Sequence, residues 1–290
     1  MKPEMDRRET FADSVRAPTS PRARLRQAAR GGFLTLRGMA LPDPGSRFLR
    51  CLYSHYVFDD QRREFQTLIR ALCDIGAFVP TEAAVDMISG KTPIDGRYFH
   101  LSYDDGLGCL YRNAAPVLDA QGIPAIFFVN SAVAGETSDE ARHAWDCATG
   151  YARPLSVMSW PELKELNMAG FEIGAHTRNH ARLSTISQDH AHLKDEVRGC
   201  KKEIEAHLEQ ECRYISWPYG TVADVDVDSI REIREAGFEA AFGAYRMRIS
   251  PGSTNPFMIP RHHFEPQWPL RHTLYFACGG METPTHLPPW

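Results

Sequence analysis

From residue 47 onward, short apolar runs alternate with longer segments in which apolar residues recur every three or four positions. The short runs predict buried strands, and the longer segments predict amphipathic helices. We expect strands at residues 47–53, 98–103, 124–129, 171–175, 212–217 and 238–242. We expect helices at 60–74, from 81 onward, 110–121, 159–170, 187–208 and 227–236, with a polar excursion at 134–157. Strands that alternate with helices favour a mostly parallel sheet, and this much alternation favours a closed or distorted (β/α) barrel.

Residues 1–46 have a different composition, rich in arginine and proline and poor in large apolar side chains. Such a composition is typical of a loosely packed extension that precedes the folded part of a chain. We therefore divide the chain into a basic extension, 1–46, and one domain, 47–290. An alternative is that the extension is a basic arm that contacts anionic lipid headgroups or a partner.

Composition narrows the function classes. The net charge of −4 disfavours a nucleic-acid binder, which is usually basic. No apolar segment of secretory type follows the polar N-terminus, and no stretch approaches the roughly 18 apolar residues of a membrane helix. The seven cysteines are dispersed and contain no C-x-x-C pair, which is typical of free thiols in a reducing compartment. A cytoplasmic protein is expected.

Reactive side chains follow three of the predicted strands. Asp104 and Asp105 come after the strand at 98–103, His176 follows 171–175, and Pro218 and Tyr219 follow 212–217. In an α/β barrel the chemistry is located at the carboxyl ends of the strands. The sequence therefore predicts one polar site built from three separate segments.

The spacing of these residues suits a metal site. Two imidazoles four positions apart, His176 and His180, can bind one ion, although a surface histidine pair has the same spacing. The glutamate of the H-E-x-x-H motif is absent, so a general base must come from another segment. In Asp104-Asp105-Gly106 one carboxylate can bind a metal while the other faces its water, and a divalent cation would keep both ionised. An exposed Asp-Asp-Gly turn is the alternative, but the apolar strand before it disfavours an exposed position.

Together these segments resemble the polysaccharide deacetylase family, also called the NodB-homology or carbohydrate esterase 4 family. Ser102–Gly106 resembles its T-F-D-D-G motif, and His176–His180 resembles its H-[S/T]-x-x-H motif. Residues 123–129 and 158–174 are also similar to family segments, and the resemblance covers residues 48–265. It implies a distorted (β/α) barrel of the NodB-homology type.

The resemblance also implies roles for individual residues. Asp104 would be the general base, and Asp105, His176 and His180 would hold a divalent metal, expected to be zinc, with a coordination position open. The same ligand set also suits iron, cobalt or nickel. Trp217–Gly220 is similar to the third family motif, in which a backbone N–H, here that of Tyr219, helps to hold the oxyanion.

This chain departs from the family pattern at two points. The arginine that often opens the third motif is replaced around Ser216, and Arg261 is a candidate for its role. The histidine acid near the C-terminus has no clean match. A circularly permuted subgroup carries a Y-H-x-V element before the first motif, and 51–57 resembles it with one extra residue, so we expect His55 to be the general acid, with His262 or His263 as alternatives. The candidate substrate contacts are Trp217, Pro218, Arg261 and His262.

The resemblance implies a metal-dependent hydrolase of amide bonds that removes the N-acetyl group of an amino sugar. The sugar would be lipid-linked, nucleotide-linked, or part of an oligo- or polysaccharide. Alternatives are a deformylase or cyclic-amide hydrolase on a non-sugar substrate, a sugar-binding member without turnover, and a structural zinc protein. Trp145, Trp217 and Trp268 are either core residues or a platform on which sugars stack.

Overall fold

The computed structural model describes residues 9–15, 22, 25, 29, 31, 32, 34, 35, 47–135 and 138–282. One parallel sheet organises these residues, in the strand order β7-β6-β5-β4-β3-β1-β8, with β2 paired to β3. Its strands are β1 (Phe48–Ser54), β2 (Ala77–Phe78), β3 (Arg97–Tyr103), β4 (Ile126–Val129), β5 (Glu172–Ala175), β6 (Tyr214–Ser216), β7 (Ala240–Phe242) and β8 (His262–His263). All six expected strands are therefore present.

The segment from Ile259 into β8 connects the two edges of the sheet. The Ile259 N–H donates to the Ala241 carbonyl of β7, and three residues later His262 pairs with Leu52 of β1. A segment that bonds to β7 at one end and to β1 at the other curls the sheet and brings its edges together. This geometry confirms the expected distorted (β/α) barrel.

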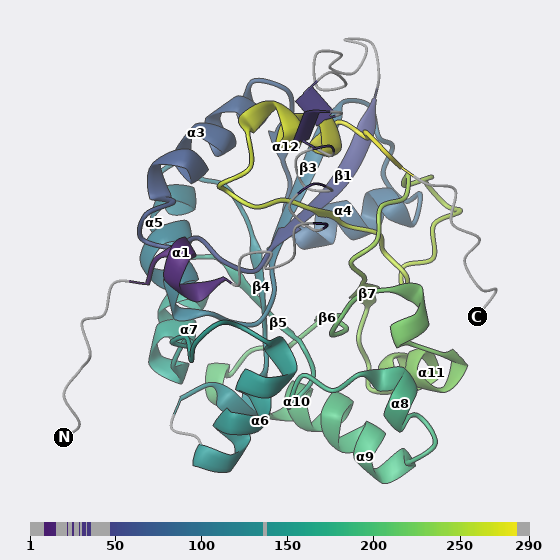
Figure 1. The fold of residues 1–290 in the computed structure, drawn as a ribbon. Helices are drawn as coiled ribbons and strands as arrows, with labels where there is room; N and C mark the ends of the chain where they lie inside the picture. The colour runs from purple at the N-terminus through teal and green to yellow at the C-terminus, as the bar shows by residue number, and fades with distance from the viewer. Residues whose placement is uncertain are drawn as a thin grey trace.

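Helices surround the curled sheet (Figure 1). They are α1 (Phe11–Ser14), α3 (Arg62–Cys73), α4 (Thr81–Ile88), η1 (Leu110–Ala114), α5 (Ala115–Asp119), η2 (Ser131–Val133), α6 (Asp139–Thr149), α7 (Trp160–Met168), α8 (Leu183–Ile186), α9 (His190–Lys194), η3 (Asp195–Gly199), α10 (Cys200–Leu208), η4 (Val222–Asp224), α11 (Val227–Glu235) and α12 (Leu270–Ala277). Within the described ranges, no helix combines the length and apolar composition needed to cross a bilayer.

Side chains on opposite sides of each strand build two apolar clusters. On β4, Ile126 and Phe128 face the barrel interior, where α4 also packs, whereas Phe127 and Val129 join the layer beneath the outer helices. Both faces of β4 are thus covered, which explains its uninterrupted apolar sequence. The same alternation places His100 and Ser102 of β3 inside the barrel, on the side toward which Asp104 also points.

Several helix boundaries differ from those expected. Ser187 does not cap the helix that follows it, because the cap is Asp189, whose carboxylate accepts from the His192 N–H. The predicted helix at 110–121 begins with a π-helical turn, and another, η3, interrupts the long helix at Asp195–Gly199. The polar excursion contains α6, which Ser138 caps. β2, β8 and α12 were not predicted.

The described N-terminal residues are packed against the domain rather than loosely attached. Glu9 is 6% exposed, and its backbone exchanges hydrogen bonds with Asp59, while the Ala152 N–H donates to the Ser14 carbonyl. The expected loose packing is therefore wrong for residues 9–15. Most of the proposed basic arm lies outside the described residues, so its contact with lipid remains a prediction.

Replacing Glu9 with alanine should destabilise the domain by about 1–3 kcal/mol, because the variant loses the charge-assisted hydrogen bonds of a buried carboxylate. The Glu9 carboxylate accepts from the Ser156 N–H at 2.7 Å and from Arg112 at 2.6 Å. Urea unfolding should show a lower midpoint for Glu9→Ala and little change for the exposed control Glu211→Ala. Equal midpoints would mean that this anchor contributes nothing to stability.

Candidate metal centre

Asp105, His176 and His180 converge at the carboxyl ends of β3 and β5. One ligand atom from each lies within 4.8 Å of the others, and all three residues are buried. The Asp105 Oδ1 atom is 3.5 Å from His176 Nε2 and 3.4 Å from His180 Nε2. The structure thus brings together the three residues expected to hold a metal.

Unusual backbone conformations aim these side chains inward. Six non-glycine residues in the described ranges have positive φ, and four of them lie in the strand-end motifs: Asp105, Thr177, His180 and Tyr219. A non-glycine residue with positive φ costs on the order of 1–3 kcal/mol, and such strain concentrates at functional sites. The fold therefore concentrates this costly geometry at the strand ends that carry the cluster.

The donor atoms fit a divalent cation. His176 Nδ1 lies 2.7 Å from the Ser216 carbonyl, which can only accept, so Nδ1 carries the proton and a neutral ring turns the Nε2 lone pair toward Asp105. Asp105 Oδ1 is buried without a hydrogen-bond partner. A lone pair that faces an anionic oxygen is repelled unless a proton or a cation lies between them. Two imidazoles and a carboxylate form a donor set that binds zinc and related metals.

The electrostatics of the cluster keep Asp105 anionic. Burial alone would raise the pKa of Asp105, but the neighbouring imidazoles of His176 and His180 lower it well below its ordinary value. The Tyr151 hydroxyl also donates to Asp105 Oδ2 at 2.8 Å. Burial, and then the charge of Asp105, raises the pKa of Tyr151 well above its ordinary value, so the phenol remains a donor.

Asp104 is held by a buried arginine. Arg261 donates to Asp104 Oδ1 at 2.8 Å and to Oδ2 at 2.7 Å. The other donations of the guanidinium go to the Gly243 carbonyl and to the hydroxyls of Ser102 and Ser216. All five N–H groups of Arg261 are thereby occupied. Arg261 therefore orients Asp104 and has no donor left for the substrate contact that we expected.

Neighbouring positive charges keep the Asp104 carboxylate ionised. Burial, the largest influence, would raise its pKa, but the charges of Arg261 and His176 outweigh burial, and the pKa of Asp104 is lowered. An ionised carboxylate beside a candidate metal centre is a competent proton acceptor.

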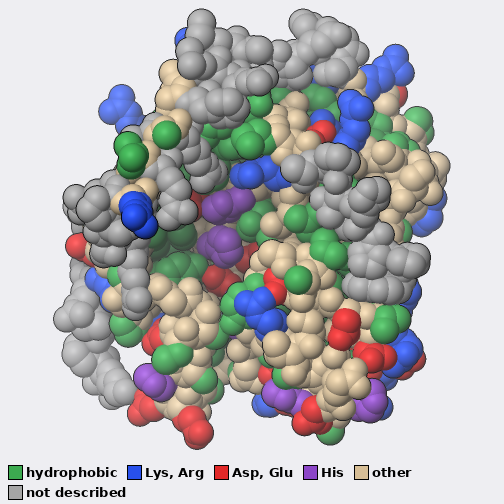
Figure 2. All heavy atoms as spheres, turned by 45° about the vertical axis from the view of Figure 1, so that its right-hand side comes forward, with side chains coloured by type: hydrophobic (Ala, Val, Ile, Leu, Met, Phe, Trp, Pro, Cys, Tyr) green, Lys and Arg blue, Asp and Glu red, His purple; other side chains and the backbone are tan. Residues whose placement is uncertain are grey.

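A cavity of about 380 Å³ opens onto this cluster. Figure 2 shows a hollow on one face of the molecule in which histidine side chains lie near acidic ones. Its lining residues come from strand ends, from the end of α6 and the loop after it, and from the end of α1. They are Val15, His55, Tyr56, Asp105, Ala148, Thr149, Gly150, Tyr151, His180, Tyr219 and Glu265. The volume lies within the range of small-molecule sites.

The histidines considered as general acids occupy different places. His55 lines the cavity, and its ring centroid lies 5.6 Å from that of His263. His262 is 1% exposed, and its Nε2 atom is 3.5 Å from Glu282. Since neighbouring strand residues point to opposite faces, His262 and His263 diverge within β8. This position places His262 away from the cavity, so neither substrate contact nor proton donation is available to it.

Comparison with known proteins gives the family. A family model described as polysaccharide deacetylase matches residues 91–241, which hold the Asp104-Asp105, His176–His180 and Trp217–Gly220 segments. The chain belongs to the polysaccharide deacetylase family. His55 and Arg261 lie outside the matched residues.

One curated relative and two solved structures are similar to this chain. It is 27% identical over 179 residues to the poly-β-1,6-N-acetyl-D-glucosamine N-deacetylase of Staphylococcus aureus, which covers 59% of this chain and 55% of the relative. The chain thus spans about half the length of that relative. Its fold resembles IcaB from Ammonifex degensii (TM-score 0.64, 24% identity, 80% of this chain and 98% of that one). It also resembles the Streptococcus pyogenes deacetylase PplD in complex with acetate (TM-score 0.63, 15% identity, 81% and 99%).

The third motif of this polysaccharide deacetylase family member borders the cavity through Tyr219. The Tyr219 ring is 41% exposed, lies 5.0 Å from the ring of His180, and carries the Arg182 guanidinium 3.8 Å from its centroid. Trp217 is 1% exposed, its indole N–H donates to the Thr221 carbonyl, and Pro218 is also buried. Because both side chains are buried, the expectation that Trp217 and Pro218 contact the substrate is wrong.

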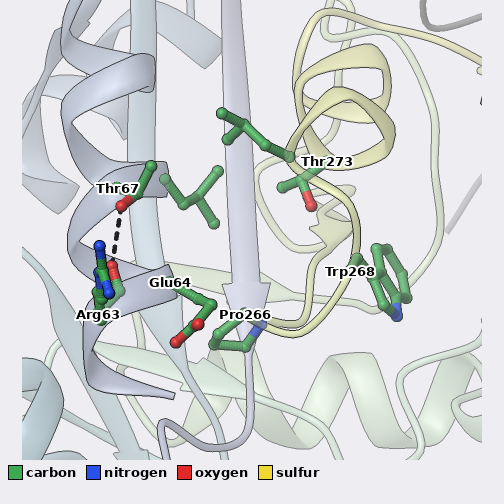
Figure 3. Close-up of a pocket in the computed structure, with 8 residues that line it drawn as sticks. Arg63, Glu64, Thr67, Pro266, Trp268 and Thr273 are labelled. Carbon is green, nitrogen blue, oxygen red and sulfur yellow. Dashed lines mark hydrogen bonds between the residues drawn. The ribbon is translucent and has the colours of Figure 1, made fainter.

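The tryptophans do not form a platform at the cavity. Trp145 is buried, and its indole N–H donates to Asn130. Trp268 packs against His263 and lines a separate small hollow between α3 and α12, with Arg63 on the opposite side (Figure 3). Core packing therefore accounts for Trp145 and Trp217.

Tyr151 is the site residue that the sequence reasoning missed. It belongs to the segment 134–157, which reads as a polar excursion and carries no metal-ligand spacing. Nothing in the local sequence marks Tyr151 as a partner of Asp105, because the contact depends on how α6 and its following loop fold back.

Proposed function

We propose that this chain is a metal-dependent N-deacetylase that hydrolyses the N-acetyl groups of an amino-sugar oligomer or polymer. The observation that carries the proposal is the buried Asp105, His176 and His180 cluster beside the ion-paired Asp104. Family membership and the likeness to a poly-N-acetylglucosamine deacetylase support a sugar substrate.

The residues divide the chemistry among themselves. A divalent cation held by Asp105, His176 and His180, with zinc expected, would supply Lewis acidity for the attacking water and the acyl oxygen. Asp104, kept ionised by Arg261, takes the proton of the water. The backbone N–H of Tyr219 donates to the developing oxyanion. His55 gives a proton to the departing amine nitrogen, which would otherwise leave as a strongly basic anion.

Acetate release from short N-acetylglucosamine oligomers tests the proposal. We expect acetate and free amine in equal amounts, loss of turnover after dialysis against a chelator, and recovery when zinc is restored. His176→Ala should fail to retain metal because one of three ligands is removed, whereas the exposed control His190→Ala should retain it. Undiminished turnover in the chelated protein would contradict metal dependence.

The same assay distinguishes the alternatives. Formate release from an N-formyl substrate, or opening of a cyclic amide, would favour a non-sugar hydrolase. Tight binding of the oligomer without acetate release would favour a sugar-binding protein. The cytoplasmic location remains a prediction, and fractionation of cells that express the full-length protein would test it.

A further inference from the structure

The two oxygens of the Asp105 carboxylate have different surroundings. Oδ2 accepts a hydrogen bond from the Tyr151 hydroxyl at 2.8 Å. Oδ1 has no hydrogen-bond partner and faces the Nε2 atoms of His176 and His180. We propose that Tyr151 is a positioning residue that fixes the Asp105 carboxylate so that only Oδ1 is available to a cation. This inference rests on the metal centre of the proposed function, but not on the deacetylation itself.

The backbone on both sides of Tyr151 is anchored by hydrogen bonds. Before it, Gly150 ends α6 in a left-handed conformation (φ 70°) and donates to the Asp146 carbonyl. After it, the Ala152 N–H donates to the Ser14 carbonyl. The Tyr151 ring also packs near Trp145, at 6.3 Å between centroids. A donor anchored by a helix end and by the N-terminal segment reaches Asp105 without having to be ordered when the metal binds.

This arrangement has a direct consequence for metal affinity. A carboxylate can offer a metal one oxygen or two, and the choice changes the coordination number. The hydrogen bond from Tyr151 occupies Oδ2, which favours ligation through Oδ1 alone and leaves a coordination position open for water. Hydrogen bonds that orient metal ligands typically contribute 10–100-fold to metal affinity.

Tyr151→Phe removes the hydroxyl and retains the ring. The matched control is Tyr98→Phe, because the Tyr98 hydroxyl also donates to a carboxylate, that of Asp95, at 2.5 Å, on the exposed surface. Zinc affinity of the full chain, measured by competition with a chromogenic chelator, should fall by about 10–100-fold in Tyr151→Phe. Tyr98→Phe should bind zinc as the wild type does. Thermal unfolding of the metal-free proteins verifies that both variants fold, and Tyr151→Met provides a second variant without the donor.

The visible spectrum of the cobalt-loaded protein provides a second readout. With Oδ2 released, Asp105 can supply two oxygens, so the d–d absorption of Tyr151→Phe should weaken as the coordination number rises. Wild-type zinc affinity together with a wild-type cobalt spectrum in Tyr151→Phe would overturn the proposal, as would a wild-type protein that binds no divalent cation. A change confined to KM would also overturn it, because it would mean that Tyr151 contacts substrate. Tight, Tyr151-dependent zinc binding without acetate release would refute only the deacetylase function.

Discussion

Asp104→Asn should lower kcat for N-acetyl hydrolysis by about 10²–10⁴-fold, the contribution typical of a general base. Asparagine has nearly the same shape as aspartate but cannot accept the proton of the attacking water. The three residues of the metal cluster are unchanged, so the metal content of the variant should equal that of the wild type. The measurements are kcat with an N-acetylglucosamine oligomer and metal analysis of the same sample.

The comparison needs a control for stability. Asparagine at position 104 leaves the buried Arg261 guanidinium without its anionic partner, so the variant should also unfold at a lower temperature. Both rates must therefore be measured well below the lower unfolding transition. The control variant Asp139→Asn, at an exposed position, should change neither kcat nor the unfolding temperature. Full turnover by metal-loaded Asp104→Asn would show that another residue acts as the base.

The sequence predicted those parts of the fold that local patterns determine. The run at 124–129 is apolar because both faces of the strand are covered, and such a run is visible without any knowledge of tertiary structure. β8 has only two residues and forms because it pairs with β1. Such a short strand has no periodic pattern of apolar residues from which it could be predicted. α6 has a single buried residue, Trp145, which gives its sequence the appearance of a polar loop.

The same distinction applies to the site. Asp105, His176 and His180 lie within compact motifs at strand ends, so the resemblance could locate them. The contact between Arg261 and Asp104 joins residues 157 positions apart, and the sequence could offer Arg261 only as a candidate. Choosing between His262 and His263 requires knowing which face of β8 each residue occupies, and that depends on strand pairing.

Arg261→Met should destabilise the domain by about 3–5 kcal/mol, because removing one partner of a buried ion pair leaves an uncompensated charge. Arg261 and Asp104 are 1% and 2% exposed, so water cannot replace the lost hydrogen bonds. Urea unfolding at pH 7 measures the change. The double variant Arg261→Met/Asp104→Asn should regain part of the loss, since it removes the stranded carboxylate.

The pH dependence of the unfolding free energy distinguishes the electrostatic contribution of Arg261 from its packing contribution. In the wild type the pKa of Asp104 is lowered on folding, so its contribution to stability is present above the unfolded pKa, near 4, and is lost as the pH falls through the folded pKa. Without Arg261, burial becomes dominant, and the pKa of Asp104 should rise above its unfolded value. The variant then gains relative stability on acidification, because its folded state binds the proton more tightly. The difference between the two proteins should therefore shrink as the pH falls from 7 toward 4, whereas a difference that is constant with pH would mean that Arg261 stabilises the barrel only through packing.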